Sequence, residues 1–197
     1  MDGVADVRDA LRWLRAHAAE YGIDPERIAL FGNSAGAHMA ALAASAPDLD
    51  TFRGDNNLDF PCDVRAVVCL YGTSDLTRVA MDMDPETQRL HTLPQACEAQ
   101  YVNGVLSGLG ILDNPEEAAR ANPVTYVTGG EPPFLHLHGD RDNLISPSMS
   151  LLLHNALLEH GGISIRFVLL GENHGTAGFY TRPAMNLISG FLKEYLD

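Results

Sequence analysis

Apolar residues recur along the chain with two different periods, and together they predict strands that alternate with helices. The clearest strand is the near-continuous apolar run at 64–71, which ends before a glycine. A run of this kind fits a strand that is covered on both faces, as in a parallel sheet. Three further strand-like runs are predicted at 27–31, 134–138 and 163–170.

Helical spacing is clearest at the two ends of the chain. Residues 4–20 place apolar side chains at 7, 10, 11 and 14, with arginines between them, and predict an amphipathic helix. Helices are also predicted after the other strands, at 35–45, 146–160 and 183–196, whereas residues 46–63 read as a polar loop. Alternating strands and helices predict a right-handed, mostly parallel α/β sheet with helices on both faces.

The second and third strands are separated by a long segment, residues 73–131, that has no strong strand signal. It contains one predicted helix at 94–102 and a helical turn at 115–120. Such an insertion is typical of a lid or cap over a site, although a packed structural excursion fits equally well. We expect residues 1–197 to form one domain that carries this segment as a cap-like insertion.

Composition narrows the class of protein without identifying a substrate. The chain has 197 residues, enough for one well-buried domain, and 46% of them are hydrophobic. A formal net charge of −13 argues against nucleic acid or an anionic membrane as a partner. No apolar run approaches the roughly 18 residues of a membrane-spanning helix. Neither observation identifies a substrate; a small-molecule partner is expected from the chemistry of the motifs described below, and a homo-oligomer is compatible with the sequence.

Three cysteines, Cys62, Cys69 and Cys97, show neither metal-ligand spacing nor a disulfide framework. The cysteines therefore indicate no metal site, although one disulfide stays open; no cofactor is expected for the chemistry described below. The same pattern favours the cytoplasm over an oxidising compartment. Secretion stays open as an alternative, because an upstream N-terminus could hold a signal peptide.

The sequence Gly-Asn-Ser-Ala-Gly at 32–36 is the most informative motif. It follows the strand predicted at 27–31 and opens a helix of small residues, which is the context of a nucleophile elbow. Ser34 is the expected nucleophile, and Gly32 and Gly36 are expected to remove side chains that would clash in the sharp turn. The backbone N–H of Ala35, at the positive end of the helix, is the expected oxyanion donor.

A serine nucleophile needs a base that is oriented by a carboxylate, and both appear in the expected order. Asp140 and Asp142 follow the strand at 134–138, and His174 follows the strand at 163–170. The carboxyl ends of parallel strands lie at one edge of a sheet, so these side chains should meet Ser34. We favour Asp142 as the acid and His174 as the base, with Asp140 as a turn-capping alternative.

Three other histidines near these motifs fit other roles. His38 lies four residues after Ser34 and is expected to pack or to support the site. His136 and His138 are strand residues that fit core or edge positions better than the role of a base.

These motifs, together with Asn122-Pro-Val-Thr-Tyr-Val127 and Pro132-Pro-Phe-Leu-His-Leu-His-Gly-Asp-Arg-Asp142, resemble the carboxylesterases of the α/β-hydrolase superfamily. The nearest branch contains hormone-sensitive lipases and bacterial acetyl-xylan and feruloyl esterases. The resemblance implies Ser34 as nucleophile, Asp142 as acid, His174 as base, and hydrolysis of short acyl esters, including acetylated carbohydrate. An arylformamidase-type amidase or a peptidase of the same fold is the alternative.

The sequence departs from that branch in one respect. Its members carry a His-Gly-Gly oxyanion motif well upstream of the elbow, whereas this chain has neither that motif upstream nor the early strands of the usual sheet. We therefore expect a shortened α/β-hydrolase fold with about four strands, and favour the C-terminal part of a longer protein. A catalytically incompetent fragment that acts as a binding module is the non-enzyme alternative.

Overall fold

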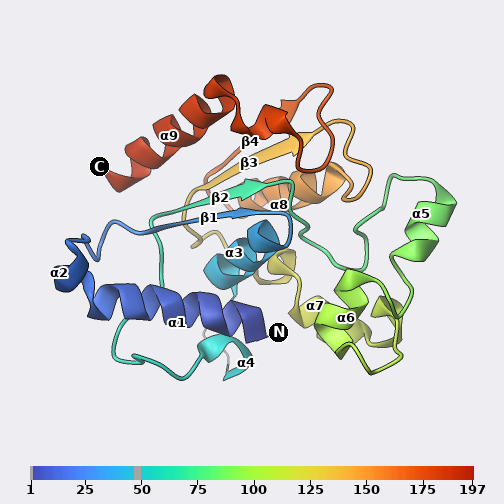
Figure 1. The fold of residues 1–197 in the computed structure, drawn as a ribbon, viewed down its shortest axis with the longest axis horizontal. Coiled ribbons are helices and arrows are strands. Elements are labelled where there is room, and N and C mark those ends of the chain that lie inside the picture. The colour runs from blue at the N-terminus through green and yellow to red at the C-terminus, as the bar shows by residue number, and fades with distance from the viewer. Residues whose placement is uncertain (1, 47–49) are drawn as a thin grey trace.

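The computed structural model describes residues 2–46 and 50–197, which contain a four-stranded sheet in the order β1-β2-β3-β4 (Figure 1). All three neighbouring pairs are parallel, as the alternating pattern predicts. The strands are β1 (Ala29–Asn33), β2 (Ala66–Leu70), β3 (Phe134–Gly139) and β4 (Ser164–Leu169).

Helices cover both faces of this sheet (Figure 1). The α-helices are α1 (Asp2–Ala16), α2 (Ala18–Tyr21), α3 (Ala35–Ser45), α4 (Asp50–Arg53), α5 (Pro85–Leu90), α6 (Cys97–Asn103), α7 (Pro115–Arg120), α8 (Ser148–Glu159) and α9 (Arg182–Leu196). Short 3-10 helices are η1 (Ile111–Asp113), η2 (Pro123–Tyr126) and η3 (Ala177–Tyr180). Among the described residues, no helix is both long and apolar enough to cross a membrane.

Successive side chains of β2 point to opposite faces of the sheet, so this strand contributes to the hydrophobic core on each face. Val67 and Cys69 pack with α1, α3 and α8 on one face. Val68 and Leu70 pack with η3 and α9 on the other. All five residues of β2 are buried, which agrees with the expected coverage of both faces.

Three local predictions are wrong. The helix predicted at 4–20 ends at Ala16 and restarts as α2. The polar loop predicted at 46–63 contains α4, because Phe52 is fully buried there; residues 47–49 of that prediction lie outside the described residues. The helix α5 was not expected, although Asp84 is a good N-cap that accepts hydrogen bonds from two backbone N–H groups of its first turn.

The arginines between the apolar positions of α1 are buried against loop carbonyls. Arg8 donates to the carbonyl oxygen of Ala46 at 2.7 Å, and Arg15 donates to that of Asp63 at 2.6 Å. A guanidinium offers five N–H donors, so each side chain can satisfy several carbonyls that would otherwise be buried unpaired. These bonds attach the end of α3 and the segment before β2 to α1.

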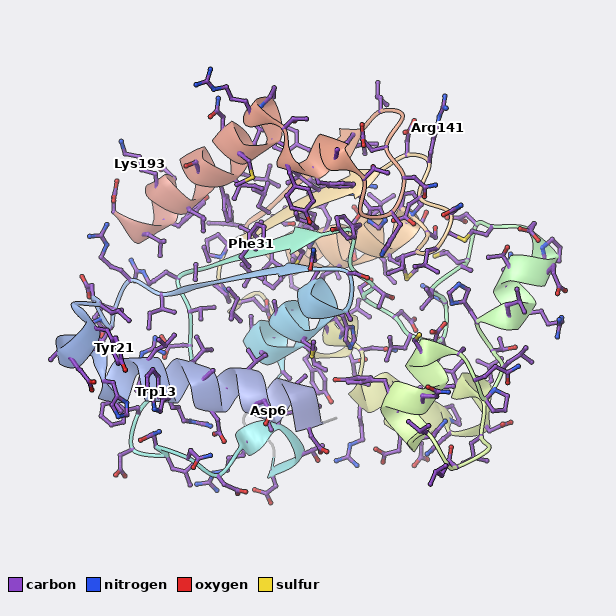
Figure 2. All side chains as sticks on the ribbon, in the orientation of Figure 1. Asp6, Trp13, Tyr21, Phe31, Arg141 and Lys193 are labelled. Carbon is purple, nitrogen blue, oxygen red and sulfur yellow. The ribbon has the colours of Figure 1, made fainter. Side chains whose placement is uncertain are left out.

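One edge of the sheet is formed by β1, where Phe31 lies 49% exposed (Figure 2). This strand runs directly into the turn that carries Ser34. The other strands run parallel to β1, so their carboxyl ends and the loops that follow them lie at the same end of the sheet as Ser34.

Candidate active site

The turn between β1 and α3 has the strained geometry of a nucleophile elbow. Ser34 has φ +51° and ψ −122°, a conformation that non-glycine residues rarely adopt. Its backbone N–H donates to the carbonyl of Leu70 at 2.9 Å, which fixes the turn to the end of β2. A conformation so costly persists only where the surrounding structure holds it, and such strain is concentrated at functional sites.

The two glycines of the elbow differ in what they permit. A Cβ on Gly32 would lie 2.2 Å from the carbonyl oxygen of Gly36, so only glycine fits there. A Cβ on Gly36 would meet only the Oδ1 atom of Asn33, at 3.9 Å, which is an ordinary contact. The clash expected at Gly32 is present, whereas the prediction of a clash at Gly36 is wrong because that side of α3 is open.

Three side chains from three different loops meet above the sheet edge. The Oγ atom of Ser34 lies 2.9 Å from Nε2 of His174, and Nδ1 of His174 lies 2.9 Å from Oδ2 of Asp142. A carboxylate can only accept, so Nδ1 carries the proton and Nε2 is left to accept the serine proton. The structure thus brings together the three residues that the sequence places in separate loops.

Burial separates the two candidate acids. Asp142 is 6% exposed and faces His174. Asp140 is exposed and accepts a hydrogen bond from the backbone N–H of Gly171 at 2.6 Å, which fits its alternative role as a turn residue. Arg141, between them, points away from the sheet (Figure 2). This geometry agrees with the preference for Asp142.

Asp142 is held as a carboxylate by four donors. Its Oδ1 atom accepts from the backbone N–H groups of Leu144 and Ile145, each at 2.9 Å, and its Oδ2 atom accepts from His138 and His174. Burial acts to raise the pKa of Asp142, but these hydrogen bonds outweigh burial and hold the pKa well below its usual range. The acid is therefore ionised whenever His174 can act as a base.

His138 is a member of the site that sequence reasoning placed in the core. The residue is fully buried, and its Nε2 atom lies 3.1 Å from both Oδ2 of Asp142 and the carbonyl oxygen of Ile145. Both partners accept, so Nε2 carries a proton that is shared between them. The position at the end of β3, just before the loop with the acid, is the only signal that the sequence offered.

A tyrosine cluster supports the other side of the base. The ring of Tyr71 stands edge-on to the ring of His174 with 4.8 Å between centroids. The hydroxyl of Tyr71 lies 2.8 Å from that of Tyr180, and Asn33 donates to both hydroxyls. Burial, followed by the bond with Tyr180, raises the pKa of Tyr71 to about 12. Tyr71 therefore stays protonated and holds the side of the imidazole without competing for its proton.

The two loops with the acid and the base are also fastened to each other. The side-chain oxygen of Asn173 accepts from the backbone N–H of Asn143 at 3.0 Å and from that of His174 at 2.7 Å. The N–H of Arg141 donates to the carbonyl of Glu172 at 3.0 Å. These bonds fix the distance between acid and base independently of the side chains that do chemistry.

A cavity of about 360 Å³ opens beside Ser34 and Ala35. Part of its wall comes from α6, through Cys97, Glu98 and Tyr101, so the segment 73–131 contributes directly to the site. Ala35 is the first residue of α3, where the backbone N–H groups have no intrahelical partner and can serve an anion.

The chain does contain a His-Gly-Gly sequence, at 160–162, but it follows α8 and precedes β4. It therefore lies at the amino ends of the strands, opposite the site. Among residues 2–46 and 50–197, no group of three or more His, Cys, Asp or Glu side chains is placed to hold a metal ion.

Comparison with known proteins gives relatives for almost the whole chain. A family described as BD-FAE matches residues 2–157. Esterase LipQ of Mycobacterium tuberculosis is 32% identical over 98% of this chain and 43% of its own length. The chain spans less than half the length of the curated relatives that it matches over most of its own length.

Solved structures agree on the fold. A truncated form of a carbohydrate esterase from gut microbiota matches with a TM-score of 0.82 and 25% identity, over 98% of this chain and 67% of that one. Thermogutta terrifontis esterase 2, phosphorylated by paraoxon, matches with a TM-score of 0.70 and 25% identity, over 97% of this chain and 62% of that one. The sheet and its helices are thus a shortened α/β-hydrolase fold, as the sequence predicts.

Proposed function

The chain belongs to the BD-FAE family. We propose that it hydrolyses carboxylic esters through an acyl-enzyme formed on Ser34. The observation that carries the proposal is the continuous hydrogen-bonded path from Ser34 through His174 to the buried carboxylate of Asp142. The names of the relatives, which are esterases, support the same reaction class.

The mechanism follows from the tautomer of the base. Nε2 of His174 takes the proton of the Ser34 hydroxyl while the serine oxygen bonds to the ester carbonyl carbon. The negative charge on the carbonyl oxygen is stabilised by the N–H of Ala35 and by the positive end of α3. The protonated His174 then gives its proton to the departing alcohol as the C–O bond breaks. Water, activated by the same histidine, releases the acid and restores the serine.

Asp142 acts through His174 and exchanges no proton of its own. Its charge stabilises the imidazolium that forms when Ser34 is deprotonated, and its hydrogen bond keeps the imidazole in the reactive tautomer. Because the hydrogen bonds to Asp142 hold its pKa well below the usual range, the acid performs both tasks across the neutral pH range.

We further propose that the substrates are short acyl esters, including acetylated carbohydrate. The cavity of about 360 Å³ has room for a short acyl chain or a single ring. The similarity to a carbohydrate esterase supports a sugar on the alcohol side. Residues 73–131 then serve as the cap, because their α6 supplies one wall of the cavity.

Hydrolysis of p-nitrophenyl acetate tests the proposal. The chain should release p-nitrophenol with saturation kinetics, and Ser34→Ala should abolish the enzymatic rate. A fluorophosphonate should label the wild-type chain at Ser34 and fail to label the variant. An unchanged rate in Ser34→Ala would contradict the assignment. A panel of acetyl esters, formyl anilides and peptide anilides then separates an esterase from an amidase or a peptidase.

A further inference from the structure

Tyr71, which follows β2, is the second residue of the site with a strained backbone. Its φ of +40° lies in the left-handed region, where a bulky side chain is a genuine outlier. Among the described residues, the other non-glycine residues with positive φ are Ser34 and Asn57, and asparagine tolerates that region readily. The N–H of Tyr71 donates to the carbonyl of Leu137 at 2.8 Å, which holds this backbone in place. Because strain of this kind is concentrated at functional sites, the direction of the Tyr71 side chain calls for an explanation.

The ring of Tyr71 is aimed at the base. It stands at 69° to the imidazole of His174, with 4.8 Å between the ring centroids. It also packs against Phe179, with 4.5 Å between centroids and an angle of 65°. Phe179 is fully buried and Tyr71 is only 3% exposed, so the contact with His174 is supported by the close-packed core. A ring supported in this way limits how far the imidazole can tilt.

Asn33, the second residue of the elbow motif, fastens the far end of the Tyr71 ring. Its amide nitrogen donates to the hydroxyl of Tyr71 and to that of Tyr180, each at 3.0 Å. The two hydroxyls lie 2.8 Å apart. Asn33 ends β1, whereas Tyr180 belongs to η3, which closely follows His174. The turn with the nucleophile and the segment with the base are therefore joined through two tyrosine hydroxyls as well as through the triad itself.

The hydrogen bonds of His174 change during the reaction, whereas its contact with Tyr71 does not. In the resting site, Nδ1 is bonded to Asp142 and Nε2 to Ser34. Once the oxygen of Ser34 has bonded to the carbonyl carbon and lost its proton, Nε2 must present that proton to the departing alcohol instead. At that stage only the bond to Asp142 still holds the imidazole. The ring of Tyr71 is then the remaining group described here that keeps the imidazole from tilting.

We infer that Tyr71 is a positioning residue for proton delivery to the leaving alcohol, and that Asn33 holds Tyr71 in place through its hydroxyl. The inference rests on the proposed function and concerns one step of it, in which the Nε2 proton of His174 passes to the alcohol oxygen as the C–O bond breaks. Tyr71 exchanges no proton itself. An imidazole that tilts still accepts the serine proton but delivers it less often. Loss of Tyr71 should therefore harm most the esters whose leaving group needs a proton.

Two acetates that differ by one methylene group isolate this step. p-Nitrophenyl acetate releases a phenolate whose charge is delocalised into the nitro group, so this leaving group departs without a proton. p-Nitrobenzyl acetate releases an alkyl alcohol, whose oxygen needs the proton of His174. Both esters form the same acetyl-enzyme, so kcat/KM, followed as acid release in a pH-stat, compares only the acylation step.

Three substitutions remove parts of the arrangement. Tyr71→Leu removes the ring and should lower kcat/KM of p-nitrobenzyl acetate about tenfold or more beyond its effect on p-nitrophenyl acetate. Tyr71→Phe keeps the ring but loses the bonds of the hydroxyl, and should show the same selective loss at several-fold. Asn33→Leu should reproduce the effect of Tyr71→Phe, because it removes the donor to that hydroxyl.

The ratio of the two kcat/KM values is the readout, because it does not depend on the fraction of folded chain in a preparation. Tyr126→Phe is the matched control, since the hydroxyl of Tyr126 donates to the carbonyl of Arg120 and not to a residue of the site. This control should keep the wild-type ratio. If Tyr71→Leu has no measurable rate, the milder Tyr71→Phe decides the question.

The outcomes separate the inference from the proposed function. An unchanged ratio in Tyr71→Leu, whether or not both rates fall, or an equal change of ratio in Tyr126→Phe, overturns the positioning role and leaves the esterase proposal intact. A selective loss in Tyr71→Leu with unchanged ratios in Tyr71→Phe and Asn33→Leu overturns the part assigned to Asn33. A wild-type chain that hydrolyses only p-nitrophenyl acetate overturns the inference alone, because His174 then delivers no proton. Failure to hydrolyse either acetate overturns the proposed function as well.

Discussion

Replacement of Asp142 by asparagine should stop catalysis while leaving the fold almost intact. The Oδ1 atom of Asp142 accepts two backbone N–H groups, so the oxygen of the introduced amide must take that place. Its NH₂ group then faces His174, donates to Nδ1, and moves the imidazole proton to Nε2. An Nε2 that carries a proton cannot accept one from Ser34. We expect kcat to fall about 10⁴-fold, the size typical of a triad held in the wrong tautomer.

The same substitution should cost little stability. Both backbone hydrogen bonds to the side chain are kept, and His138 retains its bond to the carbonyl of Ile145 at 3.1 Å. The lost charge-assisted hydrogen bonds from the two histidines, partly replaced, should lower the free energy of unfolding by about 1–3 kcal/mol. Because hydrogen bonding depresses the pKa of Asp142, this stabilisation is present above the ordinary carboxyl pKa and is lost as pH falls below it.

Initial rates with p-nitrophenyl acetate and urea unfolding curves measure the two effects separately. Asp140→Asn is the matched control, since this exposed side chain accepts from Gly171 and an amide oxygen can do the same. Its rate should stay within about threefold of wild type. A rate for Asp142→Asn within tenfold of wild type, or an equal loss in Asp140→Asn, would refute the assignment of the acid.

Three further substitutions test other parts of the structure. Gly32→Ala should lower the free energy of unfolding, measured in urea, by about 1–3 kcal/mol or more, because its Cβ would lie 2.2 Å from a backbone oxygen. Gly36→Ala should be neutral or should stabilise α3 by up to about 1 kcal/mol. Equal effects of the two substitutions would contradict this account of the elbow. His138→Phe removes a donor to the triad carboxylate and should lower kcat about tenfold with little change in KM, and an unaltered kcat would make the residue merely structural. The hydrogen bond that His91 donates to the Glu98 carboxylate raises the pKa of His91 above its ordinary value, so the pair stabilises the fold fully below that ordinary pKa and progressively less as pH rises through the raised value. Glu98→Gln should therefore lower the thermal midpoint more at about pH 5.5 than at about pH 9, and a loss independent of pH would exclude a charged His91.

The elements that sequence could predict are those with a local physical cause. The strand at 66–70 is buried on both faces, and its apolar run reflects that burial directly. The elbow is encoded by Gly32, whose missing Cβ permits the close approach of α3. Asp142 and His174 were placed by topology, because loops after parallel strands share one edge of the sheet. Their roles in catalysis stay predictions until the substitutions are made.

Other features depend on tertiary contacts that no local pattern records. The short helices α4 and α5 lie in segments whose polar composition resembles loops, and each is fixed by one residue, a buried Phe52 or a capping Asp84. The predicted clash at Gly36 is absent for the same reason. The space beside a residue depends on how its neighbours pack, and the sequence of the turn does not record that packing. His138 looked like a core histidine because strand alternation gives the face of a side chain but not the loop that folds back onto it.

The residues that line the cavity are harder to predict from the sequence than the nucleophile is. The close approach of the turn to α3 is permitted by Gly32, two positions before Ser34, so a short motif reveals the turn. His38 and Tyr101 are 63 positions apart, and each alone reads as an ordinary packing residue. Both line the cavity beside Ser34 only because the fold brings α3 and α6 together. The lining of a cavity depends on every segment that packs around it, so the residues that would contact a substrate emerge from the structure even where the catalytic groups can be named from the sequence.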